Sequence, residues 1–394
     1  MSIKGKAYIM GAYEHPLRDA PDKSTPQLHA ECAKGALEDA GLTKDDIDGY
    51  FCAGDAPGFG AMSMIDYMGL RNVRHMDSTE TGGSSYLLHV GHAAQAIAEG
   101  KCSVALITLA GRPRQNKFFG GGAGKPGQLT DGPPEAGYEN IYGGSTHNTY
   151  GMCAMRHMYE YGTTSEQLAW IKVAASHHAQ YNPHAFLKDV VTVEQVVNSR
   201  MISDPLHLLD CCVVTDGGGA LIVVSPEVAK TLNRPKVKIM GAGESPKGPM
   251  GGRGLDLTHS GAVWSGPIAF GEAGVKPSDI KYASIYDSFT ITVLMQLEDL
   301  GFCEKGQGGK FVADGNLISG VGKLPFNTDG GGLCNNHPTN RGGITKVIEA
   351  VRQLRGEAHP KVQVPNCDIA LAHGTGGSLG TRHGAATLIM EREA

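Results

Sequence analysis

The sequence has little that would suit it to a membrane or to nucleic acid. No apolar run approaches the ~18 residues of a membrane-spanning helix, and the first residues lack the apolar core and small-residue cleavage site of a signal peptide. Acidic and basic residues nearly balance, at 40 and 35 for a net charge of −5, without long blocks of one sign. We therefore expect a cytoplasmic protein with neither a membrane nor a nucleic-acid partner.

Paired metal-binding or disulfide spacings are also missing. The nine cysteines are odd in number and show no CxxC pair, and the 16 histidines show none of the spacings of zinc proteases. Reduced thiols and no metal site are the expectation.

Large aromatic residues are scarce, with two Trp and ten Phe, whereas glycine is abundant at 56 of 394 residues. Hydrophobic residues make up 41% of the chain, which excludes a disordered chain and favours a Gly-rich, compact α/β protein. The length exceeds what one hydrophobic core supports, so more than one domain-sized unit is expected.

Strand and helix signals alternate twice along the chain. Short apolar segments, typical of buried strands, alternate with segments of helical periodicity, which predicts parallel sheets covered by helices. The predicted strands are 6–11, 48–52, 103–109 and 368–372. Residues 216–224 are predicted to be a turn that enters a strand, 237–244 a strand and loop, and 283–289 a strand and turn. The predicted helices are 27–40, capped by Thr25, 84–98, 164–181, 263–273, 290–300 and 342–354. The similar order on both sides of Pro235 predicts two halves, residues 1–232 and 236–394.

Residues 111–151 interrupt this alternation. Gly, Pro, Asn and aromatic residues dominate there and no apolar period survives. Loops of this length inside a compact protein usually form active-site lids, binding walls or subunit contacts.

A first Gly-rich turn, residues 79–85, precedes the predicted helix 84–98. Backbone N–H groups near Gly83 and Ser84 at a helix N-terminus would bind a thioester oxygen or a phosphate. The alternative is a capped helix in which Ser84 or Ser85 satisfies those N–H groups.

A second turn, residues 327–338, holds a thiol, two amides and an imidazole close together. Cys334, Asn336 and His337 are the notable residues. A histidine on such a loop can act as a general base, since its ordinary pKa lies near working pH. A surface loop with a bystander histidine is the alternative.

A third turn, residues 373–380, directly follows a predicted strand and contains His373 and Gly376. Residues at the carboxyl ends of strands are favoured for function in open α/β sheets. Tyr286 ends another predicted strand and either exchanges a proton with a substrate oxygen or is a half-buried packing residue.

Taken in order, these segments resemble the thiolase superfamily, specifically its sterol-carrier-protein-type members. The resemblance spans nearly the whole chain and rests on residues 82–100, 160–185, 210–223, 286–303, 327–338 and 373–377. It implies a five-layer αβαβα fold from two repeated halves, a dimer, and acyl-CoA thioester substrates without a bound cofactor.

The chain departs from the family pattern at the nucleophile. Counting back from Gly100, Gly83 stands where thiolases carry their reactive cysteine, and glycine cannot form an acyl-enzyme. Tyr286 stands where the sterol-carrier subgroup has histidine, as in the thiolase-fold aldolases that cleave steroid side-chain acyl-CoA thioesters. Those aldolases carry tyrosine where this chain keeps His337. We expect an unfilled space at Gly83, on the floor of a cavity where Tyr286, His337 and His373 meet.

Three functions fit this pattern. The first is C–C bond cleavage or formation on acyl-CoA, favoured as retro-aldol cleavage of a β-hydroxyacyl-CoA, with His337 or Tyr286 handling the proton and His373 and the N–H groups near Gly83 stabilising the enolate. The second is thiolytic acyl transfer, directly by CoA or through another thiol such as Cys334. The third is a non-catalytic acyl-CoA-binding or scaffold subunit.

The resemblance also bears on further residues and on partners. Ser84, Asn336 and Gly376 join Gly83 as expected oxyanion or substrate-binding residues. Relatives that lack the cysteine, and the thiolase subunit of anaerobic toluene breakdown, commonly pair with a small zinc-ribbon and OB-fold protein. The resemblance therefore implies a homodimeric core that binds such a subunit.

Overall fold

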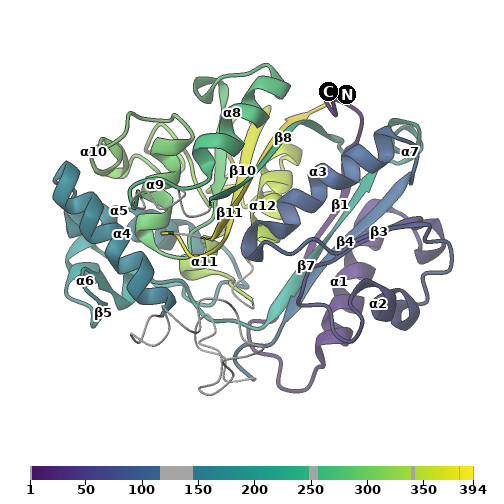
Figure 1. Ribbon diagram of the computed structural model, residues 1–394, viewed down its shortest axis with the longest axis horizontal. Coiled ribbons are helices and arrows are strands. Elements are labelled where there is room, and N and C mark those ends of the chain that lie inside the picture. Colours follow the sequence, from purple (N-terminus) through teal and green to yellow (C-terminus); the bar gives the residue numbers. More distant parts are fainter. Residues whose placement is uncertain (1, 116–144, 248–255, 339–341, 381, 394) are drawn as a thin grey trace.

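A computed structural model describes residues 2–115, 145–247, 256–338, 342–380 and 382–393 (Figure 1). The strands are β1 (Tyr8–Glu14), β2 (Gly49–Phe51), β3 (His75–Asp77), β4 (Val104–Gly111), β5 (Met201–Ser203), β6 (Leu206–His207), β7 (Gly217–Val224), β8 (Val237–Lys247), β9 (Tyr282–Ile285), β10 (Ile369–Gly377) and β11 (His383–Arg392). The α-helices are α1 (Thr25–Ala40), α2 (Ala61–Met68), α3 (Ser85–Ala98), α4 (Thr146–Tyr161), α5 (Ser165–Ala179), α6 (Val193–Val197), α7 (Pro226–Thr231), α8 (Ala262–Ala273), α9 (Thr290–Asp299), α10 (Gly308–Val312), α11 (Gly331–Cys334) and α12 (Gly343–Arg355).

Two half-sheets meet at the centre of the molecule. Within the described residues the strand order is β3-β2-β4-β7-β1-β8-β11-β10-β9, and β1 and β8 share only two residue pairs. Read outward from that junction, β1-β7-β4-β2 mirrors β8-β11-β10-β9. The two halves therefore repeat one strand order, while the exact division near residues 232–236 stays a prediction.

Three hydrophobic clusters separate five layers. One cluster lies between the half-sheets and contains the apolar faces of α3 and α12. A second packs α1 and α2 on the outer face of the N-terminal half-sheet. The third packs α4, α5, α8 and α9 on the outer face of the C-terminal half-sheet, where Figure 1 shows α4 and α5 in teal beside the green C-terminal helices. The order helix, sheet, helix, sheet, helix is the layered α/β architecture that the resemblance implies. The prediction of parallel sheets was wrong in part: β1 and β7, β4 and β7, β8 and β11, and β10 and β11 pair antiparallel, whereas β2 with β3 and β4, and β9 with β10, pair parallel.

Local signals explain most element boundaries. In α1 the cap is Ser24, not Thr25, because its side chain accepts from the Gln27 N–H in a capping box. Helix α5 begins after Thr164, which caps it in the same way. Gly41 and Gly356 end α1 and α12 with positive φ angles of 73° and 75°, which glycine adopts without strain.

Two predictions about irregular segments were wrong. The break at 111–151 ends earlier, because Ser145 caps α4 and its first turns already lie within that range; residues 116–144 lie outside the described residues. The turn at 373–380 is strand as far as Gly377, and β11 follows it as the last strand. Glycines in β10 are required for close packing: a Cβ on Gly376 would lie 1.8 Å from the Thr81 carbonyl oxygen.

Candidate active site

Tyr286 and His337 meet where β9 ends and the loop between α11 and α12 begins. The Tyr286 Oη and His337 Nε2 lie 2.9 Å apart in a hydrogen bond, and the rings pack edge to face with centroids 5.5 Å apart. Both side chains are buried. The fold thus brings into contact a phenol and an imidazole that are 51 residues apart in the sequence.

The Tyr286 ring fills the space beside Gly83. A Cβ on Gly83 would lie 2.4 Å from Tyr286 Cε2 and 2.4 Å from the Thr375 carbonyl oxygen. Neither distance is compatible with a side chain at position 83. The expectation of an unfilled space at Gly83 was therefore wrong: a nucleophile is missing, and an aromatic ring occupies its place.

A buried hydrogen-bond chain holds the His337 loop. The His337 backbone N–H donates to Thr215 Oγ1 at 2.8 Å, Thr215 Oγ1 donates to Asn336 Oδ1 at 2.7 Å, and Asn336 Nδ2 donates to Glu14 Oε1 at 2.9 Å. Both ends of the Asn336 amide thus have protein partners. These contacts position the loop, and a substrate-binding role for Asn336 stays a prediction.

Asp287 fixes the start of the same loop. Its carboxylate accepts the N–H groups of Gly332 and Leu333 at 2.8 and 3.1 Å and pairs with Lys346 Nζ at 2.7 Å. Both ionic side chains are buried, and the two N–H donors together with Lys346 compensate the Asp287 carboxylate. Sequence reasoning overlooked Asp287, although its position next to Tyr286 was a usable signal.

The environment fixes the protonation states of the central pair. Burial raises the pKa of Tyr286 well above 10, so it remains a phenol. Burial lowers the pKa of His337 to about 4, although Asp287 acts in the opposite direction. At neutral pH the pair therefore consists of a protonated phenol and a neutral imidazole, which can exchange the proton of their hydrogen bond.

His373 adjoins this pair through its backbone, while its side chain points elsewhere. Its carbonyl accepts the Tyr286 N–H at 3.0 Å. Its ring Nδ1 bonds Thr387 Oγ1 at 2.8 Å on the outer face of the half-sheet, the face that Leu371 buries. The structure thus brings Tyr286 and His337 into direct contact and places the His373 ring on a neighbouring surface.

The remaining predicted residues have structural contacts. The Ser84 hydroxyl donates to the Thr81 carbonyl at 2.8 Å and is not a helix cap. Gly376 lies against the backbone of Gly82 and Gly83. Cys334 is fully buried in the outer core, and burial raises its thiol pKa, which leaves the thiol protonated and inaccessible.

Tyr150 is a further residue close to the end of β10 that sequence reasoning missed. It stacks on Phe289 with ring centroids 4.4 Å apart, and its hydroxyl donates to the Gly377 carbonyl at 3.4 Å. It lies on α4, whose helical pattern was hidden in a stretch rich in Gly, Asn and His.

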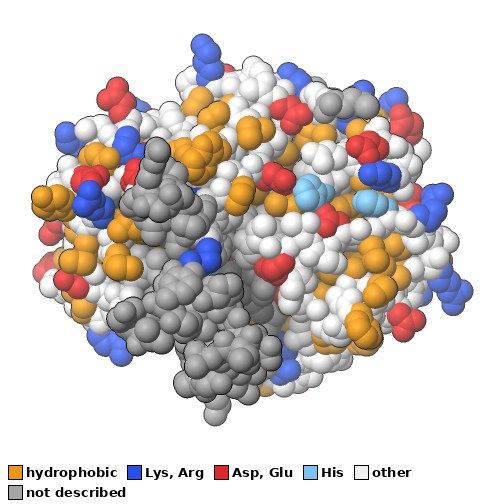
Figure 2. All heavy atoms as spheres, viewed as in Figure 1, with side chains coloured by type: hydrophobic (Ala, Val, Ile, Leu, Met, Phe, Trp, Pro, Cys, Tyr) orange, Lys and Arg blue, Asp and Glu red, His pale blue; other side chains and the backbone are white. Residues whose placement is uncertain are grey.

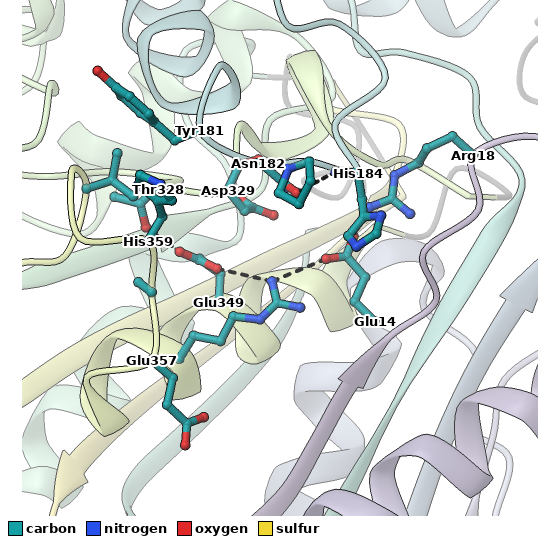
Figure 3. A pocket seen from close by; sticks show the side chains of 14 residues that line it. Glu14, Arg18, Tyr181, Asn182, His184, Thr328, Asp329, Glu349, Glu357 and His359 are labelled. Atoms are coloured by element: carbon teal, nitrogen blue, oxygen red, sulfur yellow. Dashed lines mark hydrogen bonds and ion pairs between the residues drawn. The ribbon is translucent and has the colours of Figure 1, made fainter.

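A charged pocket of about 180 Å³ is lined by Glu14, Arg18, Asp329, Glu349 and Arg352 (Figure 3). Arg352 contacts Glu14 and Glu349 there, each at 3.3 Å. Glu14, which also holds Asn336, has a pKa lowered to about 2, mainly because Arg18 and Arg352 outweigh its burial. Burial and Asp329 raise the pKa of Glu349 to about 7.

The described residues give no sign of a metal centre or a membrane span. They contain no group of three or more His, Cys, Asp or Glu side chains placed to hold a metal ion. Among their helices none is both long and apolar enough to cross a bilayer. On the face in Figure 2 the acidic and basic side chains of these residues are interspersed.

Comparison with known proteins gives a consistent set of relatives. Residues 244–392 match the family model described as Thiolase C-terminal domain-like. A steroid side-chain-cleaving aldolase from Thermomonospora curvata is 36% identical over 371 residues, covering 90% of this chain and 91% of the relative. An acetyl-CoA acetyltransferase from Methanothermobacter thermautotrophicus is 32% identical, covering 98% and 99%.

A solved structure supports the same relationship. The Ltp2-ChsH2(DUF35) aldolase superposes with a TM-score of 0.86 at 32% identity, covering 99% of this chain and 98% of that chain. These matches confirm the predicted fold of two repeated, layered α/β halves. The chain therefore belongs to the thiolase superfamily.

Proposed function

We propose that this protein cleaves a C–C bond of a β-hydroxyacyl-CoA by a retro-aldol reaction, releasing an acyl-CoA and a carbonyl compound. The observation that carries the proposal is the Tyr286 ring in the space beside Gly83. A reaction without an acyl-enzyme needs only a proton acceptor and groups that stabilise an enolate.

The Tyr286–His337 pair supplies the proton acceptor. The substrate β-hydroxyl gives its proton to Tyr286 Oη as the phenol proton passes to His337 Nε2 along the 2.9 Å hydrogen bond. The C–C electron pair moves to the thioester as an enolate, and the β-oxygen becomes a carbonyl. The same proton then returns through Tyr286 to the enolate carbon, so atoms and charge balance.

The groups around the turn before α3 supply enolate stabilisation. The N–H groups near Gly83 lie at the start of a helix, where the backbone favours negative charge. His373 adjoins Tyr286 through the hydrogen bond between β9 and β10 and carries a ring Nε2 without a described partner. The N–H groups near Gly83 are therefore the proposed oxyanion donors, because the His373 ring lies on the opposite face of β10 from α3.

The relatives favour this chemistry. One is named as a steroid side-chain-cleaving aldolase, and the superposed structure is also an aldolase. Their names describe C–C cleavage on the same fold.

The test is product analysis with a panel of CoA thioesters. Purified protein, with and without a co-expressed DUF35-type subunit, is incubated with β-hydroxyacyl-CoA and β-ketoacyl-CoA esters of increasing side-chain size. We expect a carbonyl product and a shortened acyl-CoA from the β-hydroxy series without added CoA. Cleavage of only the β-keto series, dependent on free CoA, would instead identify a thiolase, and no turnover in either series would identify a binding subunit.

Thiolysis is the second candidate because His337 is retained and a relative is named acetyl-CoA acetyltransferase. In this reaction CoA attacks directly, because Cys334, the alternative thiol, is buried and protonated.

We also propose a homodimeric core that binds a small zinc-ribbon and OB-fold subunit, with CoA entering as part of the substrate and no other cofactor. Support comes from the superposed aldolase, whose description includes a DUF35 component. Light scattering of the protein alone and with that subunit measures both associations.

A further inference from the structure

The charged pocket of Figure 3 contains more buried carboxylates than cations. The side chains of Glu14 and Glu349 are 5% and 4% exposed, and Asp329 is buried as well. The guanidinium groups of Arg18 and Arg352 face them. Three carboxylates against two guanidinium groups leave one excess negative charge. Because a buried charge without a counter-ion is costly, one of the three carboxyls is expected to carry a proton.

The other ionisable groups around the pocket leave this balance unchanged. Lys346 approaches Asp329 from α12, but its ammonium group pairs with the Asp287 carboxylate, and the two charges cancel. Glu357 lies at the exposed rim and pairs with Arg234 at 2.8 Å. Phenols and imidazoles, which are ordinarily uncharged at pH 7, complete the surroundings: Tyr282 from β9, Tyr181 and His184 from the end of α5 and the segment after it, and His359 from the segment after α12.

Two of the three carboxylates hold the loop that carries His337. Asp329 Oδ2 accepts from the Asn335 side-chain amide at 3.0 Å. Glu14 Oε1 accepts from the Asn336 amide at 2.9 Å, and Asn336 leads through the chain described above to the His337 N–H. Such N–H donors favour the ionised form of a carboxyl. The ionisation of the pocket is therefore connected to His337 by hydrogen bonds.

Glu349 has less support for a negative charge. Its Oε1 lies 2.5 Å from the Thr328 hydroxyl, and its Oε2 lies 3.3 Å from an Arg352 nitrogen that is equally far from Glu14. The geometry therefore favours the proton on Glu349. Burial and Asp329 act in the same direction and raise the pKa of Glu349 to about 7. Burial also raises the pKa of Asp329, so the two carboxyls compete for this proton.

The central pair has no ionisation of its own near neutral pH. The pKa of His337 is lowered to about 4 and that of Tyr286 is raised well above 10. The pocket is open to solvent at its rim, where His184, Glu357 and His359 are exposed. A change at His337 around pH 7 would therefore have to come from a neighbouring group that exchanges protons with solvent.

We propose that Glu349 and Asp329 are positioning residues for His337, and that they share one proton which exchanges with solvent through the charged pocket. The catalytic consequence rests on the proposed function. With the proton present, Asp329 and Glu14 remain fixed acceptors for the His337 loop. Without it, the three carboxylates repel one another and Arg352 is drawn from Glu14 toward Glu349. The geometry of the central pair is then best below about pH 7 and weakens above it.

NMR of histidine rings tests this connection without turnover. The protein is labelled with ¹⁵N in its histidine rings, and the His337 signals are assigned by their loss in His337→Gln. We expect these signals to shift with a midpoint near pH 7 in the wild type, although the ring stays neutral. In Glu349→Gln, which keeps an oxygen facing Thr328 but cannot ionise, they should not shift in this range. Glu357→Gln is the control at the pocket rim and should titrate like the wild type.

Thr328→Val provides a second variant. Its hydroxyl bonds the ionised form of Glu349 and so lowers the pKa of that carboxyl. Removing the hydroxyl should move the midpoint of the His337 signals to higher pH, even if Glu349→Gln does not fold. Wild-type signals that do not shift between pH 6 and 8.5, signals that shift equally in Glu349→Gln, or an unchanged midpoint in Thr328→Val overturn the proposal.

The pH profile of kcat measures the effect on the reaction. We expect kcat of the wild type and of Glu357→Gln to fall roughly three- to tenfold between pH 6 and 8.5, and kcat of Glu349→Gln to stay level. A merely structural role for Glu349 would instead lower kcat at every pH and keep the shape of the profile, which would contradict the proposal. A protein without turnover would refute the proposed function, while the NMR titration would still decide this inference.

Discussion

Gly83 and Tyr286 constrain each other sterically, because the tyrosine ring occupies the space that a side chain at position 83 would need. The ring of Tyr286 and the Thr375 carbonyl each leave only 2.4 Å for a Cβ at position 83. We predict that Gly83→Ala costs about 1–3 kcal/mol of unfolding free energy, as overpacking does. Chemical denaturation measures this loss. Gly100→Ala serves for comparison, because its positive φ of 72° costs strain while nothing lies within 4 Å of its Cβ.

Tyr286→Phe separates the phenol from the ring. The variant keeps the aromatic ring beside Gly83 and removes the hydroxyl that contacts His337. We predict that kcat for C–C cleavage falls by roughly 10²–10⁴, the range of general acid–base contributions, while the melting temperature changes little. An unchanged rate would remove Tyr286 from the mechanism.

For Cys334, in contrast to Tyr286, we expect that replacement leaves the reaction rate unchanged. Its side chain is fully buried, and burial raises the thiol pKa. We predict that Cys334→Ala retains the wild-type rate at a temperature where it is folded, and that mass spectrometry finds no acyl adduct on Cys334 after incubation with substrate. An adduct would restore a covalent route.

At the scale of elements, α12 anchors the His337 loop through one ion pair. Lys346 on α12 reaches Asp287, which holds the N–H groups at the start of α11. We predict that Lys346→Met lowers the unfolding free energy by about 3–5 kcal/mol, because it leaves a buried carboxylate without its cation. Urea unfolding measures the loss. Lys34→Met, on the exposed face of α1, should change it by less than ~0.5 kcal/mol.

Regular elements could be predicted wherever the apolar period was strong. α1, α5 and α9 follow their sequence patterns closely, because each combines helical periodicity with a start signal or a clear end. β11 and the end of β10 could not be recognised. Their glycines resemble a turn locally. Side chains are excluded at these positions because the backbone of the turn before α3 packs against the strands, which the local sequence does not reveal.

The candidate site was predictable to a similar degree. The motif positions of Tyr286 and His337 indicate that they converge, and the two side chains do so. The direction of the His373 ring depends on strand alternation along β10, which a turn assignment conceals.

For the whole molecule, buried histidines make stability depend on pH. Burial lowers the pKa of His89, His178 and His337 to about 4 and of His373 and His383 to about 3. In the unfolded chain each titrates near 6.5. Below that pH the unfolded state binds protons that the folded state does not, so stability falls as the pH drops from about 6.5 toward 4.

Each of these histidines lowers the free energy of unfolding by about 1 kcal/mol for each pH unit between about 6.5 and 4. His92 acts in a different range, because hydrogen bonds to Asp77 and Glu244 raise its pKa to about 9. Its contribution to stability is lost as the pH rises from about 6.5 to 9 and stays constant in the acid window. We predict a lower melting temperature at pH 5.5 than at pH 7, measured by scanning calorimetry. Replacing His373 or His383 by Leu should shrink that difference, and an equal or higher melting temperature at pH 5.5 would contradict the prediction.

The ring beside Gly83 also constrains how this lineage can change. A single codon change to cysteine at position 83 would place a thiol against an aromatic ring and a backbone carbonyl, where it could neither fit nor react. Covalent acyl transfer would first require a smaller residue 286 and a shifted β10. The intermediate protein would then lack the Tyr286 hydroxyl without yet having a reactive thiol. On this geometry a thiol at position 83 and a tyrosine at position 286 exclude each other, so one site cannot hold both kinds of chemistry.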